Sequence, residues 1–317
     1  MRTRLTLAPV LLWAALACTS TVVEKSAQPL DPDQAWEEQM ARAARFQRRG
    51  IYPSAERFYT QAFEISQSFR PGDPRVIDTL SQRAEVRLAR GQYAEAERDF
   101  RAIIERERST RGRGAELANA LNNLAVFYVD LDRIPEAEAL LAEALEIRIA
   151  IYGGRHPFVA VLLQNLADAE RRVENYENAE QLFVRALSIY ALSGEKFYRE
   201  ASIAQNNLAR VYGATQREEE SERHHLDAIR LSIKARGERN SDVGVFTRNL
   251  AMLYTRQRRY DEAEGLYQGS ISILRETLGN ANYQLSKTYR AYSQMLLAAG
   301  RVSEAREYER RADATGY

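Results

Sequence analysis

The sequence contains few residues of the kinds that form cross-links, metal sites or catalytic centres. It has a single cysteine among 317 residues, so no intramolecular disulfide can form. Its three histidines are His156, His224 and His225, and they lack the spacing of three or four residues that metal ligands on a helix prefer. The pair Gly153 and Gly154 does not have the spacing of a phosphate-binding loop. We therefore expect no enzyme, no bound metal and no cofactor.

The sequence also lacks an excess of one charge and a persistent strand pattern. It has 45 Lys and Arg against 44 Asp and Glu. A chain this balanced has no strong electrostatic bias toward nucleic acid, so we expect no nucleic-acid partner. Apolar and polar residues do not alternate over any long stretch, and the pattern therefore predicts an all-α protein.

What the sequence does contain is a repeat. The triplet Asn-Leu-Ala occurs four times, and each copy follows the previous one by 42 residues. The triplet belongs to a longer unit with two small residues twelve positions apart and, usually, a large apolar residue four positions after the second. We call the first small residue of each unit its reference residue. Regular units of this length indicate a solenoid in which each unit packs on its neighbours. Seven units fit the pattern, with reference residues Ala43, Ala84, Ala125, Ala167, Ala209, Ala251 and Ser293.

Each unit is expected to form two helices. Around Ala125, apolar residues recur at Leu121, Leu124 and Tyr128, and this spacing places them on one side of a helix. In three units a glycine such as Gly91 follows this first helix, and polar residues take the place in the others. Glycine there suits the left-handed conformation that ends a helix.

Several short motifs recur within these units. Their clearest copies are Gly91-Gln92-Tyr93, Asn123-Leu124-Ala125, Tyr128, Glu136-Ala137-Glu138, Ala144-Leu145 and His156-Pro157. Together they resemble the tetratricopeptide repeat in the 42-residue form found in kinesin light chains. The resemblance implies a right-handed superhelical solenoid of about seven antiparallel helix pairs. It also implies a protein or peptide partner bound in a concave groove lined by the first helices.

One unit departs from the pattern. The fifth unit has Ser221 and His225 where a small residue and an aromatic residue belong, and Glu218 stands where tyrosine is usual. We expect the array to be least well packed over residues 213–226. Three interpretations stay open: a hinge, a surface covered by a partner, or a divergent unit supported by its neighbours.

Polar residues on the open side of the first helices are the candidate binding site. Four asparagines stand two positions before a reference residue, on the side facing away from the packed stripe. Asparagine offers both a donor and an acceptor to an extended peptide, and arginine offers a fork for carboxylates. The alternative is that each asparagine only caps a helix or bridges neighbouring first helices, and the two roles can coexist. The candidate groove residues are Asn123, Asn165, Asn207, Asn249, Arg172, Arg210, Arg248 and Arg256.

The first residues resemble a secretory signal. Two arginines precede an apolar run over residues 5–17, which is too short for a spanning helix of about 20 residues. The single cysteine, Cys18, ends this run. The stretch Ala14-Ala15-Leu16-Ala17-Cys18 resembles the lipobox of bacterial lipoproteins, although leucine more often lies one position earlier. The alternative is an ordinary signal peptide cut near Ala17.

The lipoprotein resemblance divides the chain into four parts. They are a signal peptide at 1–17, a lipidated Cys18 with a flexible tether at 18–33, the solenoid at 34–313 and a tail at 314–317. Thr19, after the cysteine, implies sorting to the outer membrane. We predict a membrane-anchored scaffold or adaptor that faces the periplasm and supports assembly or regulation of an envelope complex. The alternative is an intracellular adaptor or regulator without a lipid anchor.

Overall fold

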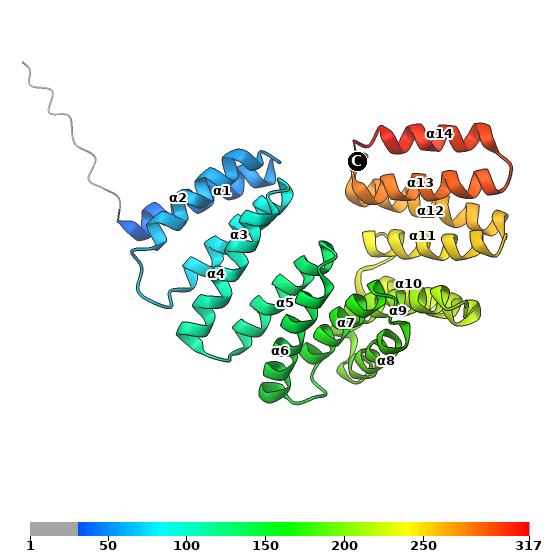
Figure 1. Ribbon diagram of the computed structural model, residues 1–317. Helices are drawn as coiled ribbons and strands as arrows, with labels where there is room; N and C mark the ends of the chain where they lie inside the picture. The colour runs from blue at the N-terminus through cyan, green and yellow to red at the C-terminus, as the bar shows by residue number, and fades with distance from the viewer. Residues whose placement is uncertain (1–30, 317) are drawn as a thin grey trace, which may run out of the picture.

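The computed structural model describes residues 31–316, and this part of the chain consists of helices and turns without a strand (Figure 1). Its helices form seven antiparallel pairs, which confirms the all-α solenoid and the number of units. Helix α1 begins two residues before the expected boundary at residue 34. The first four pairs are α1 (Pro32–Arg48) with α2 (Tyr52–Ser66), α3 (Pro74–Ala89) with α4 (Tyr93–Arg111), α5 (Ala115–Asp130) with α6 (Ile134–Tyr152), and α7 (Pro157–Arg172) with α8 (Tyr176–Ser193). After the 3-10 helix η1 (Glu195–Phe197) come α9 (Tyr198–Ala214) with α10 (Glu218–Arg236), α11 (Ser241–Arg256) with α12 (Tyr260–Leu278), and α13 (Tyr283–Ala298) with α14 (Val302–Asp313).

The small residues that define the repeat are all buried. The six alanines among the reference residues have no exposed surface, and the seventh residue, Ser293, is 3% exposed. The small residues twelve positions later, such as Ala137 and Ala179, are equally buried. Small side chains on both helices let the backbones approach closely. The large residue four positions further on, such as Leu141 or Phe183, then fills the space beside them.

The turn inside each pair uses one left-handed residue, always seven positions after the reference residue. Glycine takes this position in three units, and a polar residue other than glycine takes it in the other four. The left-handed conformation costs a residue with a β-carbon about 1–2 kcal/mol, so in those four units the packing of the two helices holds the turn. The seven residues are Gly50, Gly91, Asp132, Glu174, Gln216, Arg258 and Gly300.

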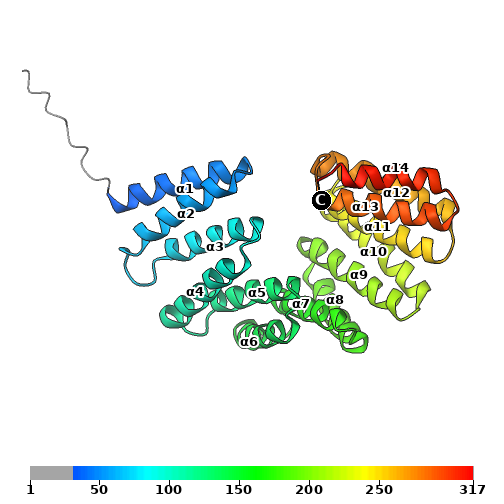
Figure 2. The ribbon, with the colours of Figure 1, turned by 45° about the horizontal axis from the view of Figure 1, so that its top comes forward.

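The seven pairs stack side by side in an arc (Figures 1 and 2). In Figure 1, α3, α5 and α7 lie on the inner side of the arc, and their partners α4, α6 and α8 lie on the outer side. Successive first helices from α5 to α13 also contact one another. The first helices therefore line the concave side, which we call the groove.

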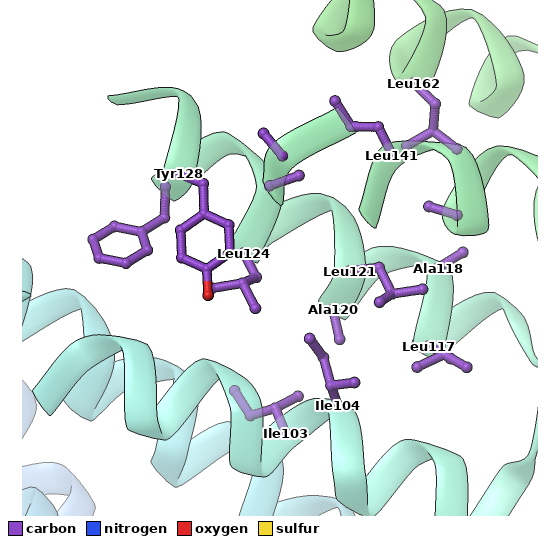
Figure 3. Packing of buried hydrophobic residues seen from close by; sticks show 14 of the residues in the cluster. Ile103, Ile104, Leu117, Ala118, Ala120, Leu121, Leu124, Tyr128, Leu141 and Leu162 are labelled. Carbon is purple, nitrogen blue, oxygen red and sulfur yellow. The ribbon is translucent and has the colours of Figure 1, made fainter. Parts of the chain in front are cut away.

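Apolar side chains form the core between the helices. Figure 3 shows Leu121 and Leu124 of α5 between Ile104 of α4 and Leu141 of α6. Leu162 of α7 reaches the same cluster from the next unit. Each unit thus completes its core with side chains from its neighbours, as a solenoid requires.

In the divergent fifth unit, most of the buried side chains of α10 are polar. The buried residues of this helix are Ser221, His225, Ala228 and Ser232. The Ser221 hydroxyl donates a hydrogen bond of 2.8 Å to the Ala209 carbonyl on α9. The two helices of this unit remain in close contact. The departure near residues 213–226 is therefore a polar core between packed helices and not a gap between them.

A further set of contacts joins units to their predecessors. In the third, fifth and sixth units, a tyrosine three positions after the reference residue donates its hydroxyl to a glutamate on the preceding second helix, and an arginine five positions later pairs with the same carboxylate. In the seventh unit the tyrosine is Tyr292, one position before the reference residue, and the arginine is Arg301, eight positions after it. In the sixth unit, Tyr254 and Arg259 lie 2.7 Å and 2.9 Å from the oxygens of Glu222. The fourth unit has Glu170 in place of the tyrosine, and this carboxylate accepts from Asn175 instead. The four Tyr–Glu–Arg contacts are Tyr128–Glu97–Arg133, Tyr212–Glu180–Arg217, Tyr254–Glu222–Arg259 and Tyr292–Glu264–Arg301.

Candidate functional site: the concave groove

Two of the four predicted asparagines bridge neighbouring first helices. Asn165 on α7 donates Nδ2 to Oδ1 of Asn122 on α5, with a distance of 2.7 Å. Asn249 on α11 donates in the same way to Asn206 on α9, at 2.9 Å. The bridging role that the sequence left open is therefore present in the fourth and sixth units.

The other two asparagines leave polar groups open to the groove. Asn123 is exposed on α5. Asn207 is half-buried on α9, and its Oδ1 accepts only long hydrogen bonds of 3.4 Å from Asn206 and Arg210. These two side chains are the better candidates for contact with a bound peptide.

Two of the predicted arginines close the ends of preceding first helices. Arg172 donates Nη1 to the carbonyl of Val129 at 2.8 Å, and Arg256 donates Nη1 to the carbonyl of Gly213 at 3.0 Å. Both carbonyls lie in the last turn of a helix, where backbone acceptors have no partner within the helix. These arginines therefore contribute to the contacts between units, and Arg256 also lines a hollow of the groove.

Arg248 differs from the prediction because most of its side chain is buried. It is 8% exposed, and it donates Nη1 to Oε1 of Gln284 on α13 at 2.9 Å. Burial, followed by repulsion from Arg210, lowers the pKa of Arg248 to about 10. The guanidinium is largely committed to the contact between α11 and α13, and it is a weaker candidate for an open carboxylate fork.

Arg210 is the predicted arginine whose guanidinium is most available. It is exposed on α9, and it donates a long hydrogen bond of 3.4 Å to Oδ1 of Asn207. Within residues 31–316 no carboxylate pairs with it. The surrounding groove walls lower the pKa of Arg210 by desolvation, and the nearby Arg171 lowers it further. An unpaired, partly desolvated cation of this kind attracts an anion.

A cavity of about 370 Å³ lies beside Arg210. Arg171 and Arg256 also line it, and no carboxylate does. The apolar part of the lining includes Met252 and Leu253. The chemistry of this hollow suits a group that combines negative charge with apolar bulk.

His225 lies in the wall of the same cavity and was not predicted as a site residue. It is 3% exposed, and its Nδ1 is buried without a hydrogen-bond partner. Burial, with repulsion from Arg210 and Arg256, lowers the pKa of His225 to about 3. The ring is therefore neutral at pH 7. No polar group of the described chain satisfies its Nδ1.

The predicted lipidation site lies outside the described residues. Cys18, the signal peptide and most of the tether precede residue 31. Among the described helices, none has the length and apolar character needed to span a membrane. Over the same residues, no group of three or more His, Cys, Asp or Glu is arranged to hold a metal ion.

The stacked helix pairs and the concave groove define a helical-repeat protein of the kind that presents a binding surface to other proteins. Models of the tetratricopeptide repeat match residues 78–98, 116–192, 203–242 and 242–312, which is more than half of the chain. The chain therefore belongs to the tetratricopeptide-repeat family. No curated protein matches the sequence.

Solved structures share this fold at low sequence identity. Aspartyl phosphate phosphatase F from Bacillus subtilis superposes with a TM-score of 0.69 at 14% identity, covering 90% of this chain and 70% of that one. A tetratricopeptide repeat protein from Parabacteroides merdae gives 0.60 at 19% identity, covering 90% and 94%. A putative kinesin light chain from Podosopora anserina with nearly identical repeats gives 0.51 at 20% identity, covering 62% and 94%. At these identities the similarity is one of fold.

Proposed function

We propose that this protein is a membrane-anchored adaptor that binds an extended segment of a partner protein in its concave groove. It has no catalytic role in this proposal. The observation that carries the binding function is the cavity at Arg210, where an unpaired guanidinium, an unsatisfied imidazole and apolar side chains meet in the groove. Members of the tetratricopeptide-repeat family bind protein segments on this surface, and the fold supports the same use here.

The cellular part of the proposal rests on the N-terminal sequence. A lipid on Cys18 would hold the array at the outer membrane, facing the periplasm, where it supports assembly or regulation of an envelope complex. Mass spectrometry of the mature N-terminus tests this directly. We expect an acylated Cys18 as the first residue and membrane-bound protein that a Cys18→Ser variant releases. An unmodified Met1 or a free Cys18 thiol would overturn the anchor and leave the intracellular adaptor.

Site-specific photocrosslinking in the native cell tests the groove. A photoreactive residue replaces Met252, which is 46% exposed in the groove, and in a matched control replaces Leu192, which is 79% exposed on the second helix α8. We expect one defined adduct from position 252 that position 192 does not give, and its loss when Arg210 and Asn207 are both changed to Ala. If both positions give the same adducts, the partner does not bind in the groove.

A further inference from the structure

The groove carries opposite charges toward its two ends. The position one after the reference residue lies on the open side of each first helix, and it holds Glu85 on α3 and Arg210 on α9. The position six before the reference residue lies on the same side and holds Asp78 on α3 and Lys287 on α13. The groove wall therefore changes from acidic to basic along the array.

The acidic end is a hollow of about 550 Å³ between α3, α4 and α5. Four carboxylates line it, and none of its lining residues is basic. Burial, with repulsion from Asp73, raises the pKa of Asp78. Within the described part of the chain, no basic side chain pairs with Asp78, Glu85 or Glu116. These carboxylates are therefore available to a cation brought by a partner.

The basic end is the cavity at Arg210. Arg210 and Arg256 have no carboxylate partner among residues 31–316. The third arginine of the lining, Arg171, already pairs with Asp168 at 2.7 Å. His225 also lines the cavity, and its Nδ1 is buried without a hydrogen-bond partner.

The region between the two hollows is close to neutral. Asp168, on α7, is shared by Arg171 and Arg172, so its charge is compensated. The asparagines of the groove, including the open side chains of Asn123 and Asn207, offer hydrogen bonds without charge. A bound segment therefore meets opposite charges at its ends and uncharged donors and acceptors between them.

We infer that the groove binds an extended, dipolar segment, with basic side chains against Glu85 and Asp78 and a carboxylate in the cavity at Arg210. The inference rests on the proposed function and adds the charge order of the segment. Glu85 and Arg210 are three units apart. First helices packed at roughly 10 Å intervals place them ~30 Å apart, which an extended chain of about nine residues spans. A segment with a single charge type would place like charges together at one end of the groove, and their repulsion would weaken binding.

Selection of random twelve-residue peptides displayed on phage, against the full-length protein, tests the charge order. We expect the selected peptides to carry basic residues toward one end and acidic residues toward the other. Selected peptides with no separation of charge would overturn the inference and leave the proposed groove function standing. If no peptide is selected, both are overturned.

Two charge reversals assign each end of the peptide to its hollow. Glu85→Lys is expected to remove the preference for basic residues only, and Arg210→Glu the preference for acidic residues only. Each change is expected to weaken a selected peptide roughly tenfold or more. The double variant should prefer the same peptide with its charged residues exchanged. Both sites are exposed and unpaired, so circular dichroism should show unchanged folding. If either single variant alters both preferences equally, the charge order is wrong.

Discussion

The amide nitrogen of Asn165 lies 2.7 Å from the amide oxygen of Asn122, and the same bridge recurs between Asn249 and Asn206. The two bridges are 84 residues apart, which is two units. They occur where the chain has Asn-Asn before leucine in the third and fifth units and a single asparagine in the fourth and sixth. The asparagine hydrogen bonds between neighbouring first helices therefore repeat every two units, whereas the helices themselves repeat every unit.

Removing one asparagine bridge is expected to destabilise the array. Asn206 is 5% exposed, so Asn249→Ala leaves a buried amide without its partner, which costs about 1–3 kcal/mol. Asn123→Ala is the matched control, because Asn123 is exposed and an exposed substitution changes stability by about ±0.5 kcal/mol or less. Urea unfolding followed by circular dichroism measures both. Equal midpoints for the two variants would show that the bridge contributes no stability.

The junction between the third and fourth units lacks a Tyr–Glu–Arg contact and can be repaired. Glu138 stands at the glutamate position there, and burial together with repulsion from Glu170 raises the pKa of Glu138. The double change Glu170→Tyr and Asn175→Arg supplies the missing tyrosine and arginine and removes the like charge. We expect it to stabilise the protein by about 1–2 kcal/mol, because it adds a charge-assisted hydrogen bond and a partly exposed ion pair.

The unfolding temperature of the double variant, compared with that of the wild type, tests this prediction, and the single variant Asn175→Arg is the control. The single variant brings an arginine to a junction that still has Glu170, so it lacks the tyrosine ring on which the guanidinium stacks in three of the four Tyr–Glu–Arg contacts. A double variant that unfolds at or below the temperature of the wild type would refute the role assigned to these contacts.

Two helical glycines are expected to respond oppositely to alanine. A β-carbon on Gly244 in α11 would lie 2.8 Å from Cγ of the buried Leu274. Overpacking of this kind costs about 1–3 kcal/mol, more than the helix propensity that alanine gains. Gly265 in α12 has no neighbour within 4 Å of the corresponding position, so Gly265→Ala should stabilise the helix by about 0.5–1 kcal/mol. Differential scanning calorimetry of both variants checks the signs. Two shifts in the same direction would contradict the packing argument.

The periodicity of the sequence was sufficient to predict the architecture. The reference residues are buried in every unit because a small residue is needed wherever two backbones approach closely, and this requirement leaves a fixed spacing in the sequence. The sequence also contains a second periodic signal. The links between the second through sixth units and those that follow contain a left-handed glycine 27 or 28 positions after the reference residue. These glycines are Gly112, Gly153, Gly194, Gly237 and Gly279.

The details of the groove were less predictable. The position of Asn165 on its own helix is set by the repeat, but its partner Asn122 is set by how α5 and α7 lie against each other. Arg248 was predicted as a groove residue because arginine can bind a carboxylate. Its burial was not predictable from its own unit, because it depends on the contact with Gln284 on α13 in the next unit. The acidic end was predictable in part. Glu85 and Arg210 each stand one position after the reference residue of their units. Comparing this position in all seven units, and not only in those with the Asn-Leu-Ala triplet, shows that its charge changes from negative to positive along the array.

His225 is expected to make the folded protein less stable than a phenylalanine at the same position would. Phenylalanine fills the equivalent position, Phe183, in the fourth unit, where it is fully buried. His225→Phe removes a buried nitrogen without a partner, and we expect it to stabilise the chain by about 1–3 kcal/mol at pH 7. The same change should weaken any peptide whose carboxylate occupies the cavity.

The stabilisation by His225→Phe is also expected to depend on pH. The folded pKa of His225 is about 3, below the ordinary value of 6.5, because the ring is buried beside Arg210, Arg256 and His224. The unfolded chain takes up a proton below pH 6.5 that the folded chain does not, so the wild type loses stability as pH falls from 6.5 toward 3, by up to about 1.4 kcal/mol per pH unit. The phenylalanine variant lacks this loss. Urea midpoints at pH 7.5, 6.0 and 5.0 should therefore diverge as the solution becomes more acidic, and a constant difference would mean that folding leaves the pKa of His225 unchanged.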